Sequence, residues 1–173
     1  MCMAPVARLL YMYTKVRGYK VVSRFFPHQV REMPLLLDAL ERFESPTWEC
    51  LYVLLLWLSS GVLVPFPLDR GTPSPSERIH RLCARFLSRP GKERDAASIV
   101  LGRLYAREEC ELFFSAFLQD AEQATASLVP TGVLQTLCAF VKQADASLIR
   151  AHYDAMLRVI AHLRTVDTRN MLV

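Results

Sequence analysis

Apolar residues recur along this chain at the three- and four-residue spacing of amphipathic helices. No segment shows the two-residue alternation, bounded by tight turns, that marks a hairpin of β-strands. Prolines, glycines and capping residues divide the helical pattern into about eight segments with short connections. The pattern therefore predicts an all-α protein, with helices at 4–25, 28–43, 47–63, 77–88, 92–107, 109–119, 131–143 and 146–164.

The apolar side of each predicted helix identifies the residues that we expect in the core. Thr47 and Ser76 are predicted N-caps, because a side-chain hydroxyl accepts a hydrogen bond from the first helical turn. Gly18 interrupts the first helix at a cost of about 1 kcal/mol relative to alanine, and we expect it to let another helix or a partner approach closely. The expected core residues include Leu9, Leu10, Tyr13, Val16, Val21, Val30, Met33, Leu37, Leu40, Phe43, Ile79, Leu82, Cys83, Phe86, Leu87, Ala96, Ala97, Val100, Leu101 and Leu104.

Helix pairs recur roughly every 35–45 residues, which is typical of HEAT-type solenoids. The sequence therefore favours a HEAT/armadillo-type α-solenoid segment, and an irregular helical bundle is the structural alternative. One continuous solenoid would place the first helical repeats in 1–64, a proline-rich linker loop in 65–76, further HEAT-like helix pairs in 77–164 and a frayed tail in 165–173.

The segment 50–68 contains 19 residues without a charge, which admits a second interpretation. A membrane-spanning helix needs roughly 20 apolar residues. Ser59, Ser60 and Gly61 interrupt the run, and two prolines close it, so the unbroken apolar stretch is too short to span a bilayer. A helix that is apolar on all sides is also typical of the inner layer of an all-α protein. The alternatives are a buried solenoid helix and a membrane-associated protein anchored by 50–68.

Composition narrows the class of protein further. Hydrophobic residues make up 52% of the chain and charged residues 22%, which excludes intrinsic disorder. The net charge of +4 is too small to indicate nucleic-acid binding by itself. The five cysteines are widely spread, which argues against a disulfide framework or zinc site and favours the reducing cytosol. Cys50, Cys83 and Cys138 have apolar neighbours and are expected in the core.

The sequence predicts no catalytic, cofactor-binding or metal site. The glycine-rich phosphate-binding motifs and the nucleophile-elbow motif are absent. Glu108, Glu109 and Glu111 form an acidic cluster, but successive helical residues point in different directions, so a solvated or capping role is preferred. A small enzyme built on that cluster is an alternative to the solenoid and membrane-associated proteins considered above. The four histidines are too scattered for a helical metal pair; they are His28, His80, His152 and His162.

Two groups of basic and aromatic residues are the candidate partner-binding sites. The first, Arg78, Arg81, Arg85 and Arg89, follows one side of a predicted helix, where the mutual repulsion of like charges favours an acidic partner. The second, Lys15, Arg17 and Tyr19, surrounds Gly18. The alternatives are a solvated arginine face and tight internal packing at Gly18. Nucleic acid is not favoured, because no aromatic residues alternate with the arginines.

Six ordered blocks within residues 10–107 match a known family. They are Lys15–Val22, Arg24–Val30, Thr47–Glu49, Leu51–Ser59, Val62–Phe66 and Lys92–Ala97. In this order they resemble the tubulin-specific chaperone D (tubulin-folding cofactor D) family. Chains of that family are several-fold longer, and the blocks match only a segment near their N-terminal end.

The resemblance implies a HEAT/armadillo-type scaffold that is not an enzyme. Members of that family bind β-tubulin and work with other tubulin-folding cofactors to assemble and dissociate the αβ-tubulin heterodimer. They also associate with an Arf-like small GTPase and stimulate GTP hydrolysis at their partners' nucleotide sites. The resemblance therefore implies these protein partners, no cofactor, no nucleic acid and no membrane, and a cytoplasmic location with microtubule or centrosome association.

Overall fold

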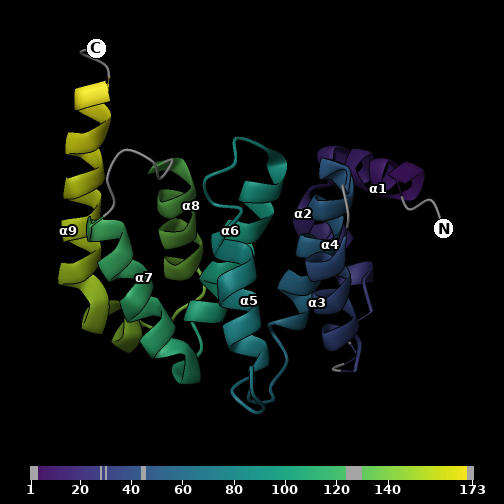
Figure 1. The fold of residues 1–173 in the computed structure, drawn as a ribbon, viewed down its shortest axis with the longest axis horizontal. Helices are drawn as coiled ribbons and strands as arrows, with labels where there is room; N and C mark the ends of the chain where they lie inside the picture. The colour runs from purple at the N-terminus through teal and green to yellow at the C-terminus, as the bar shows by residue number, and fades with distance from the viewer. Residues whose placement is uncertain (1–3, 28, 30, 44–45, 124–129, 171–173) are drawn as a thin grey trace.

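The computed structural model describes residues 4–27, 29, 31–43, 46–123 and 130–170, and this part of the chain contains α-helices and short 3-10 turns but no strand. Figure 1 shows the helices standing side by side along the long axis of the molecule. The α-helices are α1 (Ala4–Arg17), α2 (Tyr19–Val22), α3 (Glu32–Arg42), α4 (Trp48–Gly61), α5 (Pro75–Ala84), α6 (Lys92–Tyr105), α7 (Glu111–Gln123), α8 (Pro130–Val141) and α9 (Ala146–Asn170), with 3-10 turns at Ser23–Phe25 and Glu108–Cys110.

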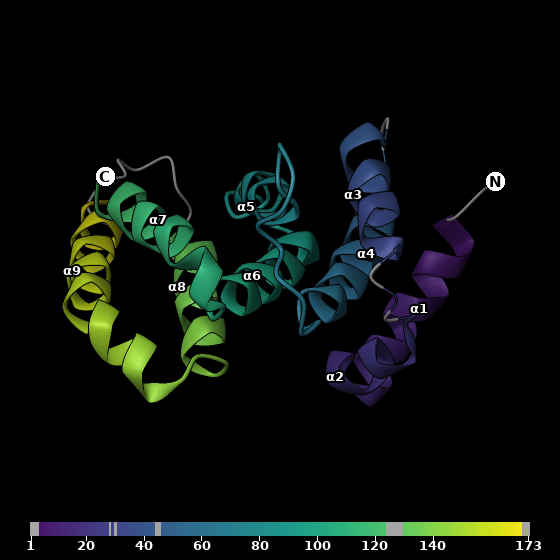
Figure 2. The ribbon, with the colours of Figure 1, turned by 90° about the horizontal axis from the view of Figure 1, so that it is seen from below.

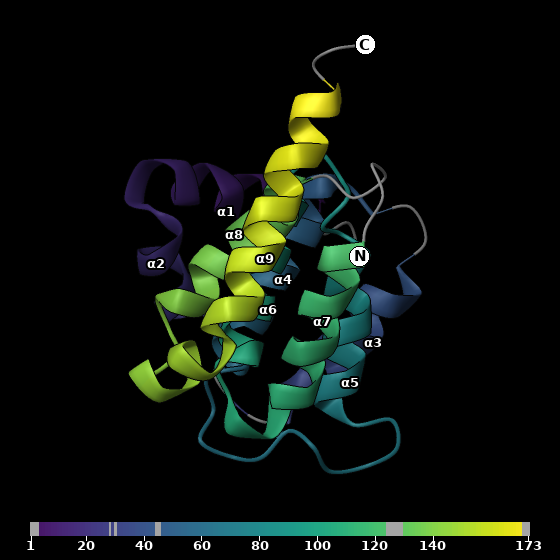
Figure 3. The same cartoon turned by 90° about the vertical axis from the view of Figure 1, so that its left-hand side faces the viewer.

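The helices form two layers, as Figure 2 shows from below. One layer, which we call the inner layer, contains α1, α4, α6 and α8, each packed on the next. The other layer contains α3, α5 and α7. Helix α9 packs on both α7 and α8 and forms the outermost helix of one end (Figure 3). This two-layer stack confirms the predicted all-α solenoid of armadillo/HEAT type and is not an irregular bundle.

Helix α4 is the buried helix that the uncharged run predicted. Every residue of Cys50–Leu56 is buried, because α1, α3 and α6 pack around it. Thr47 caps its start, as predicted, and accepts a hydrogen bond from the Cys50 amide at 3.4 Å. Within the described residues, no helix combines the length and apolar character needed to cross a bilayer. The membrane anchor at 50–68 is not favoured, because most of the apolar side chains of this segment are buried against other helices.

Arg107, just after the end of α6, holds the backbone where α4 leads into the predicted proline-rich linker. Arg107 donates hydrogen bonds to the carbonyl oxygens of Val62, Val64 and Phe66 at 2.8, 2.7 and 2.6 Å. Residues 65–74 form no helix or strand, but the hydrogen bond from Arg107 to the Phe66 carbonyl fixes the start of this loop. Helix α5 begins earlier than expected, because Ser74 rather than Ser76 caps it, accepting from the Glu77 amide at 3.2 Å.

The first predicted helix, 4–25, is divided at Gly18. This residue has φ +81°, which L-amino acids other than glycine rarely adopt, so α1 ends at Arg17 and α2 begins at Tyr19. No described atom lies within 4 Å of the position that a Cβ would take. No helix of the described chain therefore approaches closely at Gly18, so the expected tight internal packing there was wrong, and the glycine permits the change of backbone direction. The approach of a partner at Gly18 stays a prediction.

The predicted core side of the first helix was also wrong except at Leu10, which is half-buried against the core. Leu9 and Val16 are 58% and 78% exposed, and Tyr13 and Val21 are exposed as well. Helix α1 packs on α4 through its other side, where Ala7 and Thr14 are buried. Since α1 is the outermost helix of its end in Figure 1, its apolar side faces outward in the described structure.

The remaining boundaries and core predictions follow the sequence more closely. Helix α3 begins at Glu32, and the predicted residues His28 and Val30 lie outside the described residues. Helix α9 continues to Asn170, so the expected frayed tail is helical that far. Most of the other expected core residues are confirmed as buried; they are Met33, Leu37, Leu40, Ile79, Leu82, Cys83, Phe86, Leu87, Ala96, Ala97, Val100, Leu101 and Leu104. Phe43 is half-buried.

Helices α6 and α8 approach closely at Gly102 of α6. A Cβ atom on Gly102 would lie 2.4 Å from the Cβ of Ala139 on α8, well inside van der Waals contact. The missing side chain at 102 therefore sets the spacing between α6 and α8.

We expect Gly102→Ala to lower the free energy of unfolding by about 1–3 kcal/mol, because the added methyl group forces α6 and α8 apart. The matched control is Gly61→Ala, also in a helix, where the new Cβ would lie 3.4 Å from the flexible end of Met33. Helix propensity makes this control neutral or up to about 1 kcal/mol more stable. Urea unfolding followed by circular dichroism measures both, and a Gly102→Ala chain as stable as the parent would contradict the packing argument.

Candidate functional site

A groove lies on the inner layer of the solenoid, with α6 as its floor and α1, α2 and α8 along its sides. It has a volume of about 760 Å³. We call it the basic groove and define it by its lining residues: Tyr11, Thr14, Lys15, Tyr19, Lys20, Tyr52, Lys92, Asp95, Ser98, Ile99, Arg103, Thr131, Leu134, Gln135, Cys138, Ala139, Lys142 and Gln143. Its size lies in the range of ligand-binding clefts, roughly 300–1,000 Å³.

The charge of the basic groove is strongly one-sided. The chain contains four lysines, at positions 15, 20, 92 and 142, and all four line this groove together with Arg103. Asp95 is the acidic residue among the lining residues. The packing of α1, α2, α6 and α8 thus brings together charges that lie far apart in the sequence.

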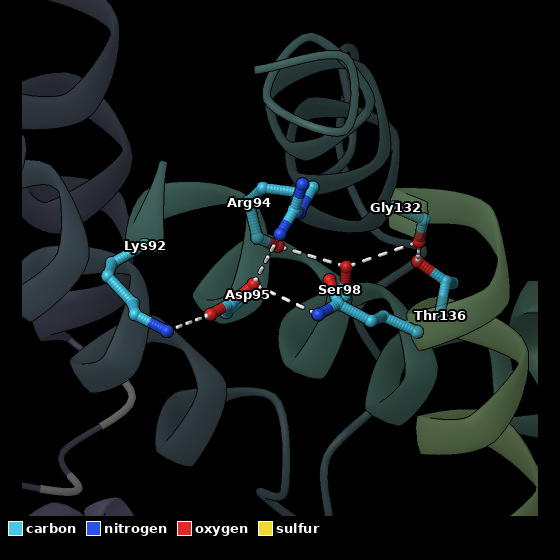
Figure 4. Close-up of polar contacts among 7 residues, drawn as sticks. Lys92, Arg94, Asp95, Ser98, Gly132 and Thr136 are labelled. Carbon is cyan, nitrogen blue, oxygen red and sulfur yellow. Dashed lines mark hydrogen bonds and ion pairs between the residues drawn. The ribbon is translucent and has the colours of Figure 1, made fainter. Parts of the chain in front are cut away.

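Asp95 is hydrogen-bonded and ion-paired to its neighbours, as Figure 4 shows. Its carboxylate accepts from Lys92 Nζ at 2.8 Å, from Gln135 Nε2 at 3.0 Å and from Arg94 at 3.2 Å. Burial by itself would raise the pKa of Asp95, but these hydrogen bonds outweigh burial and hold the pKa below its ordinary value. Asp95 therefore stays ionised and offsets the charges of Lys92 and Arg94.

A buried hydrogen bond joins α6 and α8 at the floor of the groove. The Ser98 hydroxyl lies 2.9 Å from the Arg94 carbonyl of its own helix and 3.2 Å from the Gly132 carbonyl of α8 (Figure 4). Within α8, the Thr136 hydroxyl donates to the same Gly132 carbonyl at 2.8 Å. Ser98 and Thr136 are both buried, and the Ser98 contact links the two helices.

The groove's tyrosines take part in packing within the chain. Tyr11 lies edge-on to Trp48 and Tyr52, with ring centroids 4.7 and 5.4 Å apart. Lys15 Nζ lies 5.9 Å from the centroid of the Tyr11 ring. Burial raises the pKa of Tyr52, so this residue stays a neutral phenol at physiological pH.

A second, smaller hollow of about 410 Å³ continues the groove toward the end of α4. It shares Lys20 and Arg103 with the first hollow and adds Arg24. Arg103 is held in place by donating to the carbonyl and hydroxyl oxygens of Ser59 at 2.7 and 3.0 Å. The basic surface therefore extends from Lys142 across α6 to Arg24.

The structure divides the first predicted partner-binding group. Lys15 and Tyr19 line the basic groove, whereas Arg17 is exposed and does not line it. The sequence analysis missed Lys20, Lys92, Arg103 and Lys142. The scarcity of lysine beside 17 arginines was visible in the sequence, but only the folded chain shows that the lysines share one surface.

The predicted arginine row does not lie on one helix. Helix α5 ends at Ala84, so Arg85 and Arg89 belong to the turns that follow. Arg78 faces α3 and donates to Asp38 at 2.6 Å and to Glu41 at 2.8 and 3.2 Å. Arg81 and Arg85 are exposed, and the Arg89 guanidinium lies 5.0 Å from the centroid of the Phe86 ring.

The acidic cluster separates into different structural contacts. Glu109 accepts from Arg107 at 2.7 Å and from the Leu68 amide at 3.3 Å, so it holds the proline-rich loop. Glu111 lies 3.5 Å from His152. Cys138, expected in the core, is exposed in the groove, whereas Cys50, Cys83 and Cys110 are buried. The described residues contain no group of three or more histidine, cysteine or acidic side chains able to hold a metal ion.

Comparison with known sequences places this chain in a family. The family model described as "Tubulin-specific chaperone D-like, ARM repeat" matches residues 1–125. The chain belongs to this family. Its repeat class agrees with the two-layer helical stack, so membership in the tubulin-specific chaperone D-like family confirms both the fold and the resemblance seen in the sequence blocks.

A curated relative gives a second, independent match. "Tubulin-folding cofactor D" of Schizosaccharomyces pombe is 31% identical over 139 residues, which cover 78% of this chain and 13% of the relative. The chain thus spans about an eighth of that relative's length. No solved structure matches significantly.

We expect the free energy of unfolding to fall at acid pH, as the carboxylates that contact Arg78 become protonated. Hydrogen bonds from Arg78 hold the pKa values of Asp38 and Glu41 below their ordinary values. Carboxylates with lowered pKa values stabilise the fold fully above their unfolded pKa values, and this stabilisation is lost as the pH falls through the folded ones. Arg78→Gln should therefore lower the urea midpoint at pH 7, and its difference from the parent chain should begin to shrink near pH 4 and vanish only below the lowered pKa values.

The matched control for this prediction is Arg85→Gln, which removes an exposed arginine at the end of the same helix. It should follow the parent chain at every pH. A constant difference between Arg78→Gln and the parent chain across pH 3–7 would show that the contribution of Arg78 does not come from its carboxylate partners.

Proposed function

We propose that this chain is a non-enzymatic interaction scaffold that binds tubulin as a segment of a tubulin-folding cofactor. The observation that carries the proposal is family membership, because the curated relative is named for tubulin folding. Within the αβ-tubulin heterodimer, β-tubulin is the proposed partner, and the scaffold would act when the heterodimer assembles or dissociates. The proposed location is the cytoplasm, at microtubules or the centrosome.

The described surface supports binding rather than chemistry. The basic groove contains lysines, tyrosines and one aspartate that is hydrogen-bonded on several sides. A stack of helices presents such groups at fixed separations, which favours the recognition of a complementary protein surface. The proposed mechanism is therefore surface and charge complementarity.

The contact residues proposed for tubulin come from both sequence-predicted groups. Lys15 and Tyr19 would act from the basic groove, and Arg17 from the exposed end of α1. Exposed Arg81, Arg85 and Arg89 would form a second contact region beyond α5, with Arg78 anchoring that helix on α3. Other tubulin-folding cofactors and an Arf-like small GTPase are the further proposed partners.

Binding to tubulin is tested with the purified chain immobilised through a C-terminal tag and incubated with purified αβ-tubulin. We expect tubulin to be retained, and chemical cross-links from the chain to lie mainly on the β subunit. Serum albumin, another acidic protein, is the control for general charge attraction. Equal retention of albumin, or no retention of tubulin at low salt, would refute the proposal for this segment.

A further inference from the structure

The four lysines of this chain gather on one surface, whereas its arginines are distributed over the molecule. Lys15, Lys20 and Lys92 come from α1, α2 and the start of α6, and Lys142 directly follows α8. These segments are separated by up to 127 residues along the chain, from Lys15 to Lys142. No local sequence feature brings these residues together, so their common position is a property of the fold.

Most of these charges have no acidic partner among the residues that the structure describes. Within the described residues, no ion pair forms on Lys15, Lys20, Lys142 or Arg103. Lys92 alone among the lysines is paired, with Asp95 at 2.8 Å. Cations confined to one concave surface raise its positive potential and favour a ligand that supplies negative charge.

The chemistry of lysine indicates how such a ligand is recognised. An arginine guanidinium is a planar fork that fixes a carboxylate in one orientation, whereas a lysine ammonium is a point charge on a flexible stem. Lysines around a groove can therefore bind carboxylates at several positions along a ligand's peptide chain. This property suits a run of glutamate and aspartate residues better than a single positioned acidic side chain.

The shape of the groove also favours a short, extended segment. Its volume of about 760 Å³ is too small for a folded domain, and Ile99, Leu134 and Ala139 give its lining an apolar part that a peptide chain would contact. Nucleic acid fits less well, because single strands are bound by stacking bases on aromatic faces. Tyr11 and Tyr52 are instead packed edge-on against each other, and Tyr52 is buried.

We propose that the basic groove binds an extended acidic peptide segment, with Lys15, Lys20 and Lys142 supplying the main charge contacts. Arg103 and Arg24 extend the same positive surface beyond α2. The proposal adds the chemical class of the ligand and the surface that binds it, and it holds for any acidic segment, whether or not tubulin supplies it.

The test measures fluorescence anisotropy of a labelled oligo-glutamate peptide titrated with the full chain, with oligo-glutamine of the same length as the neutral probe. We expect oligo-glutamate to bind at low salt, oligo-glutamine not to bind, and affinity to fall as salt screens the charges. The triple variant Lys15→Gln, Lys20→Gln, Lys142→Gln should weaken binding by about tenfold or more, which corresponds to about 1.4 kcal/mol.

The matched control is Arg8→Gln, Arg70→Gln, Arg150→Gln, which removes the same number of positive charges from exposed residues outside the groove. It should keep affinity within about twofold of the parent chain. Circular dichroism and the thermal midpoint establish that both variants fold; the replaced lysines are exposed, so their folding should be unchanged.

Three results would overturn the proposal: no binding of oligo-glutamate at low salt, equal loss in the two triple variants, or tighter binding of a single-stranded oligonucleotide that depends on the same lysines. The outcome is separate from the tubulin experiment. Loss of tubulin retention with intact oligo-glutamate binding would refute the proposed function alone, and the reverse would refute the groove alone.

Discussion

The close packing of α6 between α4 and α8 is the contact on which the rest of the structure depends. Ala96 and Ala97 are fully buried on α6, and Gly102 leaves room for Ala139 of α8. Small side chains let helix backbones approach, and the buried hydroxyl of Ser98 on α6 then reaches the Gly132 carbonyl of α8. The spacing of this inner layer also positions the floor and sides of the basic groove.

Arginine and lysine have different physical roles in this chain. Arg78, Arg103 and Arg107 join separate elements by donating several hydrogen bonds each, to carboxylates on α3 or to backbone carbonyls near the end of α4. The forked guanidinium makes several such bonds from one side chain. The lysines instead lie exposed along a groove, where three of them have no carboxylate partner within the described residues. The same sign of charge therefore stabilises the stack in one place and is available to a ligand in another.

Sequence reasoning succeeded where a residue's surroundings follow from its own segment. The uncharged, leucine-rich run at 51–58 predicted a helix buried on nearly all sides, and α4 is such a helix. It failed at the first helix, because an amphipathic pattern does not tell which neighbour is present. There Ala7 and Thr14 face α4, and Leu9 and Val16 face outward. The arginine row failed for a related reason, since the turns after Ala84 bury Phe86 and Leu87 and end the helical spacing that the row assumed.

The sequence by itself determined the helical content, the burial of α4 and the family, because helical periodicity, helix caps and ordered motif blocks are local properties of the chain. Tertiary structure alone decided the candidate site. Lysines at 15, 20, 92 and 142 share no spacing and no motif, and they meet only because α1 packs on α4, α4 on α6 and α6 on α8, so that α1, α2, α6 and α8 border one groove. Electrostatic potential depends on distances in space, so a surface of this kind is invisible in the order of the residues until the helices are stacked.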